Sequence, residues 1–227
     1  MRQRLIIAGT GGFARETAAL VDSLNAHHET WDLVGFVDDN PALAGSTVSG
    51  RPVLGPVDAV RDRDAAVVIC IGNPHNYFSR RRIVERLALD PNRYATLVHP
   101  TAVIGGSSTL GPGTVVHALT VLTTDVHVGA HVTMMPGIVL THDDIVDDYV
   151  TMGAGVRVAG GVHVRTGAYV GSGSLIRESL CIGEWSMIGM GAVVTHPVPA
   201  AQIWIGAPAR YMRDVAVPSE FAGVVPV

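Results

Sequence analysis

An aliphatic residue or methionine recurs at every sixth position of this chain from Val98 to Val194. The positions are Val98, Ile104, Leu110, Val116, Leu122, Val128, Met134, Leu140, Val146, Met152, Val158, Val164, Val170, Ile176, Ile182, Ile188 and Val194. A period of six fits neither an α-helix nor an alternating β-strand. Hexapeptide repeats are typical of a parallel β-helix, in which short strands joined by tight turns stack into a prism. We therefore predict that residues 96–212 form such a prism, with the repeated apolar residues pointing inward.

The first part of the chain has a different pattern, in which short apolar runs alternate with segments of helical spacing. The runs RLIIAG, DLVGFVDD and AAVVICIGN predict three strands, and FARETAALVDSL and SRRRIVERLAL predict two helices. Alternation of this kind argues for a small parallel sheet covered by helices. We predict a Rossmann-like α/β domain for residues 1–95, the β-helix domain for residues 96–212 and a C-terminal tail for residues 213–227.

Composition excludes several classes of function. The net charge of this 227-residue chain is −4, so there is no electrostatic reason to expect nucleic acid or an anionic membrane as a partner. No segment approaches the apolar length of a membrane-spanning helix, and glycines interrupt the apolar run LIIA before a signal-peptide core can form. We expect a cytoplasmic protein. Cys70 and Cys181 each lie in an apolar segment, and we expect two buried, reduced thiols.

Two turns of the first domain have the chemistry of ligand sites. Gly9–Gly12 form a glycine-rich turn between the first strand and the first helix, where the backbone can approach phosphate oxygens. Asp38 and Asp39 end the second strand, at the sheet edge where α/β domains collect ligands. A tight turn for the glycines and a polar turn for the aspartates are the simpler interpretations. These residues alone leave both interpretations open.

Three consecutive ionisable residues, His142, Asp143 and Asp144, interrupt the apolar pattern of the repeat. His142 and Asp143 take the third and fourth places of their hexad, which form a turn at a corner of the prism. Side chains there can project outward. Asp144 takes the fifth place, which is small or β-branched in most hexads and points inward. A buried carboxylate must be hydrogen-bonded or protonated, and a local widening of the corner is the alternative.

The ten histidines raise the question of a metal site. His127 and His163 are two coils apart and would lie above one another on the prism. A third ligand is missing nearby, because Ala168 occupies the position five residues beyond His163. His117 and His131 fall at turn or edge sites elsewhere in the hexad. We therefore expect these histidines to be exposed strand or turn residues, and we expect no metal.

Both halves together resemble one family of bacterial glycan synthesis. The motifs are Gly9–Glu16 after the first strand, Phe36–Asn40 at the end of the second, Ile71–Asn73 at the end of the third, His142-Asp143, and Gly206–Arg210. They are similar to those of the sialic-acid O-acetyltransferase and nucleotide-amino-sugar N-acetyltransferase family. The resemblance covers residues 4 to 212 and implies that the β-helix is left-handed.

The resemblance also implies site residues. It assigns a nucleotide-linked amino sugar to Gly11, Gly12, Phe13, Asp38, Asp39, Gly72 and Asn73, and acetyl-CoA to Thr151, Gly160, Ser172, Met190 and Gly191. His142 would be the general base, and Asp143 would orient it. Three positions depart from the family, which often has His at Phe13, Asn at Met135 and His at Thr151.

The function that this resemblance implies is acetyl-CoA-dependent N-acetylation of a nucleotide-linked amino sugar. Neither Cys70 nor Cys181 is placed to act as a nucleophile, which favours direct transfer over an acyl-enzyme. The family further implies a homotrimer with active sites between subunits. O-acetylation of a sugar hydroxyl and a non-catalytic nucleotide-sugar-binding scaffold are the alternatives.

Overall fold

The computed structural model describes residues 2–221, which fall into two compact units. The first unit runs through Pro100 and also takes in Pro112–Val115. The second contains Thr101–Gly111 and the residues from Val116 onward. Thus the first unit ends slightly later than the predicted domain boundary at residue 95.

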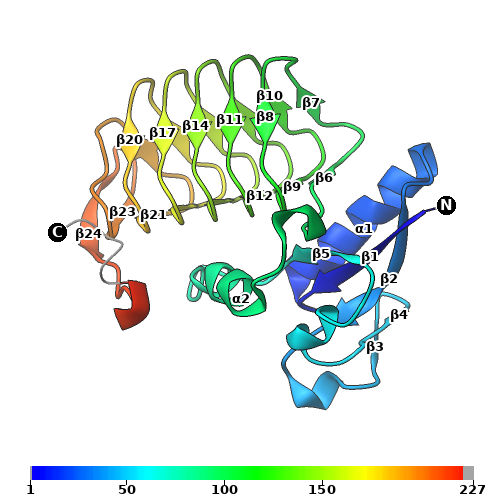
Figure 1. Cartoon of the computed structure of the whole chain (residues 1–227). Coiled ribbons are helices and arrows are strands. Elements are labelled where there is room, and N and C mark those ends of the chain that lie inside the picture. Colours follow the sequence, from blue (N-terminus) through cyan, green and yellow to red (C-terminus); the bar gives the residue numbers. More distant parts are fainter. Residues whose placement is uncertain (1, 222–227) are drawn as a thin grey trace. The chain divides into compact units, whose positions relative to one another are not determined.

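A three-stranded parallel sheet is the centre of the first unit (Figure 1). Its strand order is β2-β1-β5, with β1 (Gln3–Ala8), β2 (Trp31–Val37) and β5 (Ala66–Ile69). The helices are α1 (Gly12–His27) and α2 (Ser79–Leu87). Because side chains alternate along a strand, Leu5 and Ile7 pack into one apolar cluster with α1, and Ile6 and Ala8 pack into another with α2.

The predicted strands and helices of this unit are confirmed, and shorter elements appear between them. A hairpin pairs β3 (Thr47–Val48) with β4 (Arg51–Pro52). The 3₁₀ helices are η1 (Pro41–Leu43), η2 (Val57–Val60) and η3 (Pro91–Arg93). Asn40 and Asp90 begin two of them, because each side chain accepts a hydrogen bond from a backbone N–H two residues on.

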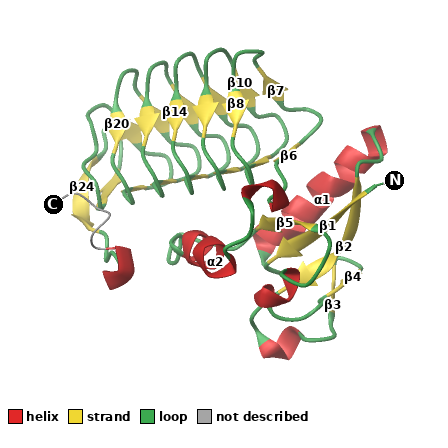
Figure 2. Ribbon diagram, viewed as in Figure 1, coloured by secondary structure: helices red, strands yellow, loops and turns green. Residues whose placement is uncertain are grey.

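The hexapeptide repeat forms a parallel β-helix of two-residue strands joined by turns (Figure 2). One face contains β7 (Val103–Ile104), β10 (Val121–Leu122), β13 (Val139–Leu140), β16 (Arg157–Val158), β19 (Leu175–Ile176) and β22 (Val193–Val194); we call it the first face. The second face contains β8 (Thr109–Leu110), β11 (His127–Val128), β14 (Ile145–Val146), β17 (His163–Val164) and β20 (Cys181–Ile182). The third contains β6 (Leu97–Val98), β9 (Val115–Val116), β12 (Thr133–Met134), β15 (Thr151–Met152), β18 (Tyr169–Val170) and β21 (Met187–Ile188).

The repeated apolar residues fill the interior of this β-helix, as the sequence predicts. From Val116 to Val194 every one of them is buried. Neighbouring strands pair in parallel at an interval of eighteen residues, so that Leu122 lies beside Leu140 and Val146 beside Val164. Each inward side chain therefore contacts its equivalents in the coils on either side, and burial of this continuous column stabilises the stack.

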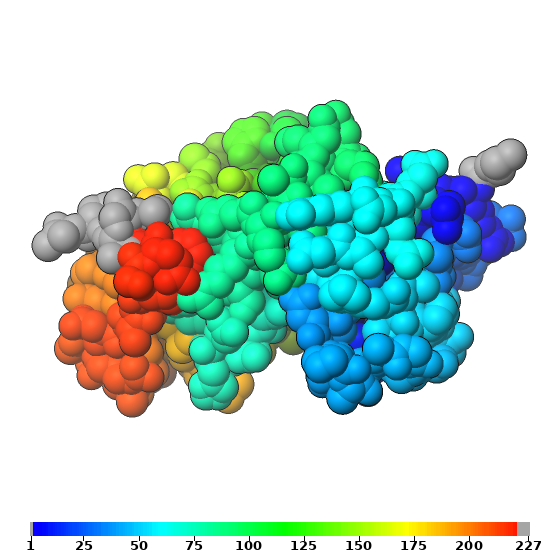
Figure 3. Space-filling view, turned by 60° about the horizontal axis from the view of Figure 1, so that its bottom comes forward, coloured from blue at the N-terminus to red at the C-terminus, as the bar shows by residue number. Residues whose placement is uncertain are grey.

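The third face continues into a short antiparallel pair at the C-terminal end of the β-helix. Strand β23 (Gln202–Ile205) pairs with β21 on one side and with β24 (Arg210–Asp214) on the other. All residues of β24 are exposed (orange in Figure 3). The predicted start of the tail at residue 213 falls inside this strand. Beyond it, Phe221 of η4 (Ser219–Phe221) is buried and stacks on Trp185; residues 222–227 of the predicted tail lie outside the described residues.

The prediction of two buried thiols is half wrong. Cys70 is buried, and this burial raises the pKa of its thiol to about 12. Cys181 is exposed, because it is the first residue of β20, whose second residue, Ile182, points into the interior. Side chains alternate between the two faces of a strand, so the repeat itself gives Cys181 its outward direction.

Within residues 2–221, neither helix has the length and apolar character that a membrane crossing would need.

The column of apolar residues predicts where a charge is not tolerated. Val164 is 1% exposed, and Val164→Asp should lower the free energy of unfolding by several kcal/mol because it buries an unpaired carboxylate. The adjacent exposed Arg165 provides the control: Arg165→Ala should change stability by less than about 0.5 kcal/mol. Urea unfolding of both variants measures this difference. Equal stability of the two would contradict the inward direction of the repeat.

Candidate active site

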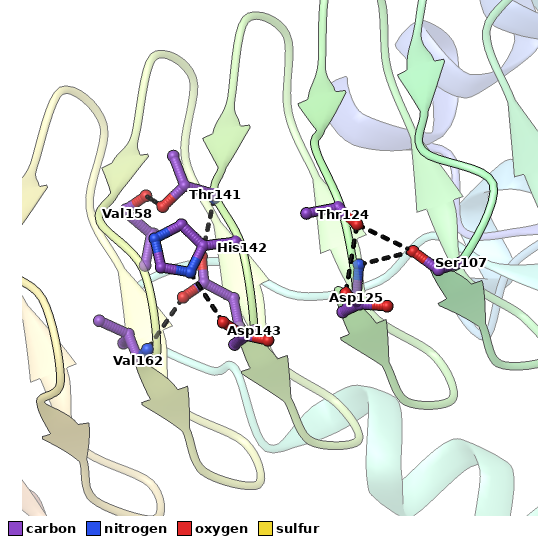
Figure 4. Close-up of polar contacts among 9 residues, drawn as sticks. Ser107, Thr124, Asp125, Thr141, His142, Asp143, Val158 and Val162 are labelled. Carbon is purple, nitrogen blue, oxygen red and sulfur yellow. Dashed lines mark hydrogen bonds and ion pairs between the residues drawn. The ribbon is translucent and has the colours of Figure 1, made fainter.

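His142 and Asp143 lie on the turn between β13 and β14, at the corner where the first face meets the second (Figure 4). Their side chains are 65% and 67% exposed. Asp143 has a positive φ of 62°, a conformation that aspartate adopts more readily than most residues other than glycine. Backbone hydrogen bonds connect this corner to the coils on either side: Asp143 N–H donates to Thr124 O, and Gly161 N–H donates to His142 O.

The two side chains form a hydrogen-bonded pair. His142 Nδ1 lies 2.8 Å from Asp143 Oδ2. This hydrogen bond raises the pKa of His142 above its ordinary value, and the negative charges of Asp143 and Asp144 add to the effect. A protonated Nδ1 bonded to the carboxylate leaves Nε2 as the basic atom of the neutral ring. The pair is therefore suited to accepting a proton from a molecule bound outside the corner.

Gly160 lies directly under the imidazole ring of His142. A Cβ atom at Gly160 would be 2.4 Å from both Cε1 and Nε2 of His142, which is closer than atoms can approach without a shift. Gly160 occupies the equivalent position one coil further along the same corner. The absence of a side chain there lets the ring rest against the backbone of the next coil.

Asp144 is buried at the same corner, with 1% of its surface exposed. Its Oδ1 accepts a hydrogen bond from Val162 N–H and its Oδ2 accepts one from Thr141 N–H, both at 2.9 Å. Burial raises the pKa of Asp144 to about 6, against the lowering effect of these two donors. Of the two possibilities that the sequence left open, the structure shows a hydrogen-bonded, inward-pointing carboxylate.

The corner one coil earlier has the same backbone and different chemistry. Thr124 and Asp125 occupy the places of His142 and Asp143. There, Ser107 Oγ lies 3.1 Å from Thr124 Oγ1 and accepts a bond from Asp125 N–H (Figure 4). The fold thus provides several equivalent corners, and only the hexad beginning at Leu140 places an imidazole beside a carboxylate in this column of residues 2–221.

The residues predicted to bind acetyl-CoA do not all lie at this corner. Gly160 lies beside His142. Ser172, Met190 and Gly191 lie along another corner, between the third face and the first, and Thr151 is a half-buried residue of β15 on the third face. Met190 is 81% exposed. One chain therefore presents most of its predicted cofactor residues on two separate corners.

A pocket of about 350 Å³ lies at the carboxyl edge of the sheet in the first unit. Its lining is Asp38, Asp39, Ile71, Ser79, Arg82, Ile83 and Arg86. Thus the structure brings the two predicted aspartates together with one face of α2. Gly72 and Asn73 are exposed next to Ile71 but do not line the pocket.

Both aspartates of this pocket already hold polar partners. Asp38 accepts hydrogen bonds from Thr10 Oγ1 and from Asn40 N–H. Asp39 accepts bonds from Val57 N–H and from Arg86. Partial burial acts to raise the pKa of Asp39, but the bonds from Arg86 and Val57 outweigh it and lower the pKa. These hydrogen bonds fix both carboxylates in place.

The glycine-rich turn divides into a structural part and an open part. Gly9 has a φ of 106°, and a Cβ atom there would lie 2.7 Å from Cys70 O, so the turn needs glycine to pack against the end of β5. Gly11 and Gly12 are exposed with open space where a side chain would be. They begin α1, and no side chain caps it. An uncapped helix N-terminus favours anions such as phosphate. Phe13 instead turns partly into the apolar cluster beside α1.

The expected exposure of the histidines is wrong for His117 and His131, which are buried, each with 4% of its surface exposed. The two histidines considered for a metal have other partners. His127 lies 2.9 Å from Thr109 Oγ1, and His163 Nε2 lies 2.9 Å from Asp147 Oδ1. Ile145 separates the two histidines in the strand register. No group of three or more His, Cys, Asp or Glu residues in the described part of the chain has a metal-binding arrangement.

Sequence reasoning missed the residues that α2 contributes to the pocket. Arg82, Ile83 and Arg86 recur at helical spacing on α2, and that spacing was a signal that they share one face. The pattern does not tell which strand edge this face of α2 meets. The pocket could therefore be found only in the structure.

Comparison with known proteins agrees with both units. Residues 4–87 match the PglD N-terminal domain family. GDP-perosamine N-acetyltransferase of Escherichia coli O157:H7 is 31% identical over 203 residues, which cover 88% of this chain and 82% of that protein. The acetyltransferase domain of PglB from Neisseria gonorrhoeae, solved with acetyl coenzyme A, superposes with a TM-score of 0.83 at 25% identity, covering 93% of this chain and all of that one. PerB from Caulobacter crescentus, solved with CoA and GDP-perosamine, has a TM-score of 0.78 at 27% identity and covers 92% and 96%.

These similarities show the fold class of the protein. It is a small parallel α/β domain followed by the left-handed β-helix of hexapeptide acetyltransferases. The resemblance noted in the sequence is therefore confirmed. The chain belongs to the family of nucleotide-amino-sugar N-acetyltransferases.

The contact between His142 and Gly160 gives a direct test of the corner. Gly160→Ala should push the imidazole off the next coil and lower kcat by about 10-fold or more, because small displacements of a catalytic group are costly. Gly106 is the matched control. It occupies the same corner column, and nothing lies within 4 Å of a Cβ placed there.

Steady-state kinetics of Gly160→Ala and Gly106→Ala, with thermal melting of both, complete this test. Gly106→Ala should keep wild-type turnover. Full turnover of a folded Gly160→Ala would show that the position of the ring over Gly160 is unimportant.

Proposed function

We propose that this protein transfers the acetyl group of acetyl-CoA to the amino group of a nucleotide-linked amino sugar. The observation that carries the proposal is the exposed His142–Asp143 pair, with Nδ1 held 2.8 Å from Asp143 and Nε2 left as the base. Relatives that match nearly the whole chain include an N-acetyltransferase of GDP-perosamine and an acetyltransferase domain solved with acetyl coenzyme A.

The chemistry follows from the pair. The nitrogen of the sugar amine attacks the thioester carbonyl and forms the new C–N bond, while Nε2 of His142 accepts the proton that the amine loses. The C–S bond then breaks, and the proton passes to the departing sulfur. Asp143 holds the ring in the required tautomer and stabilises the imidazolium formed in between. The raised pKa of His142 makes the ring a stronger base once it is deprotonated.

The nucleotide belongs, in this proposal, to the first unit. The exposed start of α1 at Gly11 and Gly12 would take the diphosphate, and Asp38 and Asp39 at the pocket would take the base or the ribose. Gly72 and Asn73 would contact the same ligand from the end of the neighbouring strand. Arg82 and Arg86 add donors that a base carbonyl or a phosphate can accept.

We further propose that the protein works as a homotrimer with acetyl-CoA between subunits. The predicted cofactor residues occupy two different corners of one β-helix, and a neighbouring subunit can bring the second corner to the first. Apolar side chains are also exposed on the outside of the β-helix, including Leu119, Leu175 and Met190 at 67%, 46% and 81%. Where such side chains form one contiguous patch, they mark a protein contact.

The test of the function is CoA release with acetyl-CoA and a panel of GDP-, UDP- and dTDP-linked amino sugars, with mass spectrometry to identify an amide product. One of these sugars should be acetylated on nitrogen. His142→Ala should then lower kcat about 10²–10⁴-fold, the usual contribution of a general base, without weakening acetyl-CoA binding. Asp143→Asn should cause a smaller loss.

Variants at the nucleotide pocket serve as the control for this experiment. Asp38→Ala combined with Asp39→Ala should raise the KM of the sugar nucleotide and leave that of acetyl-CoA unchanged. Full turnover by His142→Ala would reject the mechanism, and failure of every amino sugar while a sugar hydroxyl is acetylated would reject the acceptor.

A further inference from the structure

The most unusual residue of the corner is Asp144. It occupies the fifth, inward place of its hexad, in a column whose neighbours are Ser108, Val126, Val162 and Leu180. The surface of Asp144 is 1% exposed. A carboxylate at a position that otherwise takes apolar or hydroxyl side chains needs a reason, because burying a charge is costly unless it is fully partnered.

Its two hydrogen bonds connect the parts that locate the imidazole of His142. Oδ2 accepts from the N–H of Thr141, the residue just before the histidine. Oδ1 accepts from the N–H of Val162, which follows Gly160 and Gly161 on the next coil. One carboxylate therefore ties the turn that carries the ring to the backbone on which the ring rests.

A neutral residue in the same column makes only half of this arrangement. Ser108 Oγ accepts a hydrogen bond from Val126 N–H, eighteen residues further on, at 3.2 Å. This bond is the equivalent of the one from Val162 N–H to Asp144. Asp144 adds a second hydrogen bond, from Thr141 N–H, and a negative charge. Both lie on the coil that carries His142.

The charge of Asp144 acts on a small set of groups. Asp143 and His142 lie on its own turn. The hydrogen bond to Asp143 is the main cause that raises the pKa of His142, and the charge of Asp144 adds to it. The corner one coil earlier contributes Asp125, whose carboxylate lies 3.2 Å from Thr124 Oγ1. The next coil presents only Gly160, Gly161 and Val162 at the corner, followed by His163, which is bonded to Asp147. His142 is thus the cation-forming group beside Asp144.

We propose that Asp144 is a positioning residue for the acetyl transfer, which holds the ring of His142 against Gly160 and uses its buried negative charge to favour the imidazolium that proton transfer creates. This inference rests on the proposed function of His142. It adds a third member, a carboxylate inside the β-helix, to the exposed pair of His142 and Asp143.

The experiment compares Asp144→Ser with the wild-type chain. Serine keeps an acceptor for Val162 N–H, as Ser108 does for Val126, and removes both the charge and the bond to Thr141. The variant should lower kcat by about 10-fold or more and leave both KM values near wild type. The pKa of His142, measured by NMR titration of its ring, should fall, and the rising, acid-side limb of the pH–rate profile should move to lower pH with it.

Asp148→Ser is the matched control. Asp148 is an exposed carboxylate that also accepts a backbone bond across coils, from Ala130 N–H at 2.7 Å, but it lies at a different corner. It should alter neither kcat nor the pKa of His142. Asp144→Asn, which keeps the shape and removes the charge, gives the same comparison if the serine variant fails to fold.

A loss of kcat without any shift in the pKa of His142 would overturn the proposal, because a merely structural carboxylate would behave in that way. Unchanged kcat in a folded variant would overturn it as well. The NMR titration needs no substrate, so a shifted pKa in a protein that acetylates none of the amino sugars would contradict the proposed function and leave the coupling of Asp144 to His142 intact.

Discussion

The inward stacking of one apolar residue per hexad is the constraint on which the rest of the β-helix depends. Each of these side chains contacts its equivalents eighteen residues before and after, as Leu140 does between Leu122 and Val158. Their burial fixes the register of every strand, and the register fixes every corner. A residue at the third or fourth place of a hexad is therefore held outside the core at a defined position. The fold can vary chemistry at one corner, as it does between Thr124 and His142, without disturbing the stack.

At the corner of His142 this regularity brings together residues that are far apart in the chain. His142 rests on Gly160, and Asp144 reaches Val162 on that same coil. The imidazole is thus located by contacts from two coils, although it is 65% exposed. In the proposed function, a base held on a rigid repeat needs little ordering when substrates arrive. The first unit has a separate task in the proposed function, which is to hold the nucleotide at the pocket beside Asp38 and Asp39.

Much of this fold could be predicted because its signals are periodic. The six-residue period indicated the β-helix, and strand–helix alternation indicated the parallel sheet. The exposure of Cys181 was also readable in principle, since it precedes an inward Ile182. Other features depend on long-range contacts that no local pattern contains. These include the two backbone donors of Asp144, the pairing of Arg86 with Asp39, and the extent of β24 beyond residue 212. The division of the predicted cofactor residues between two corners became visible only once the strands had been assigned to faces.

The central claim is that His142 is the base of the reaction, and its own titration tests that claim most directly. The measurement is kcat/KM across pH 6 to 9, corrected for the separately measured titration of the substrate amine, beside an NMR titration of the His142 ring in the free protein. Because Asp143 raises the pKa of His142 above its ordinary value, activity should rise with pH along the same curve as deprotonation of the ring, with its midpoint above about 6.5. Activity that stays constant through the pH range in which the ring loses its proton would contradict the account.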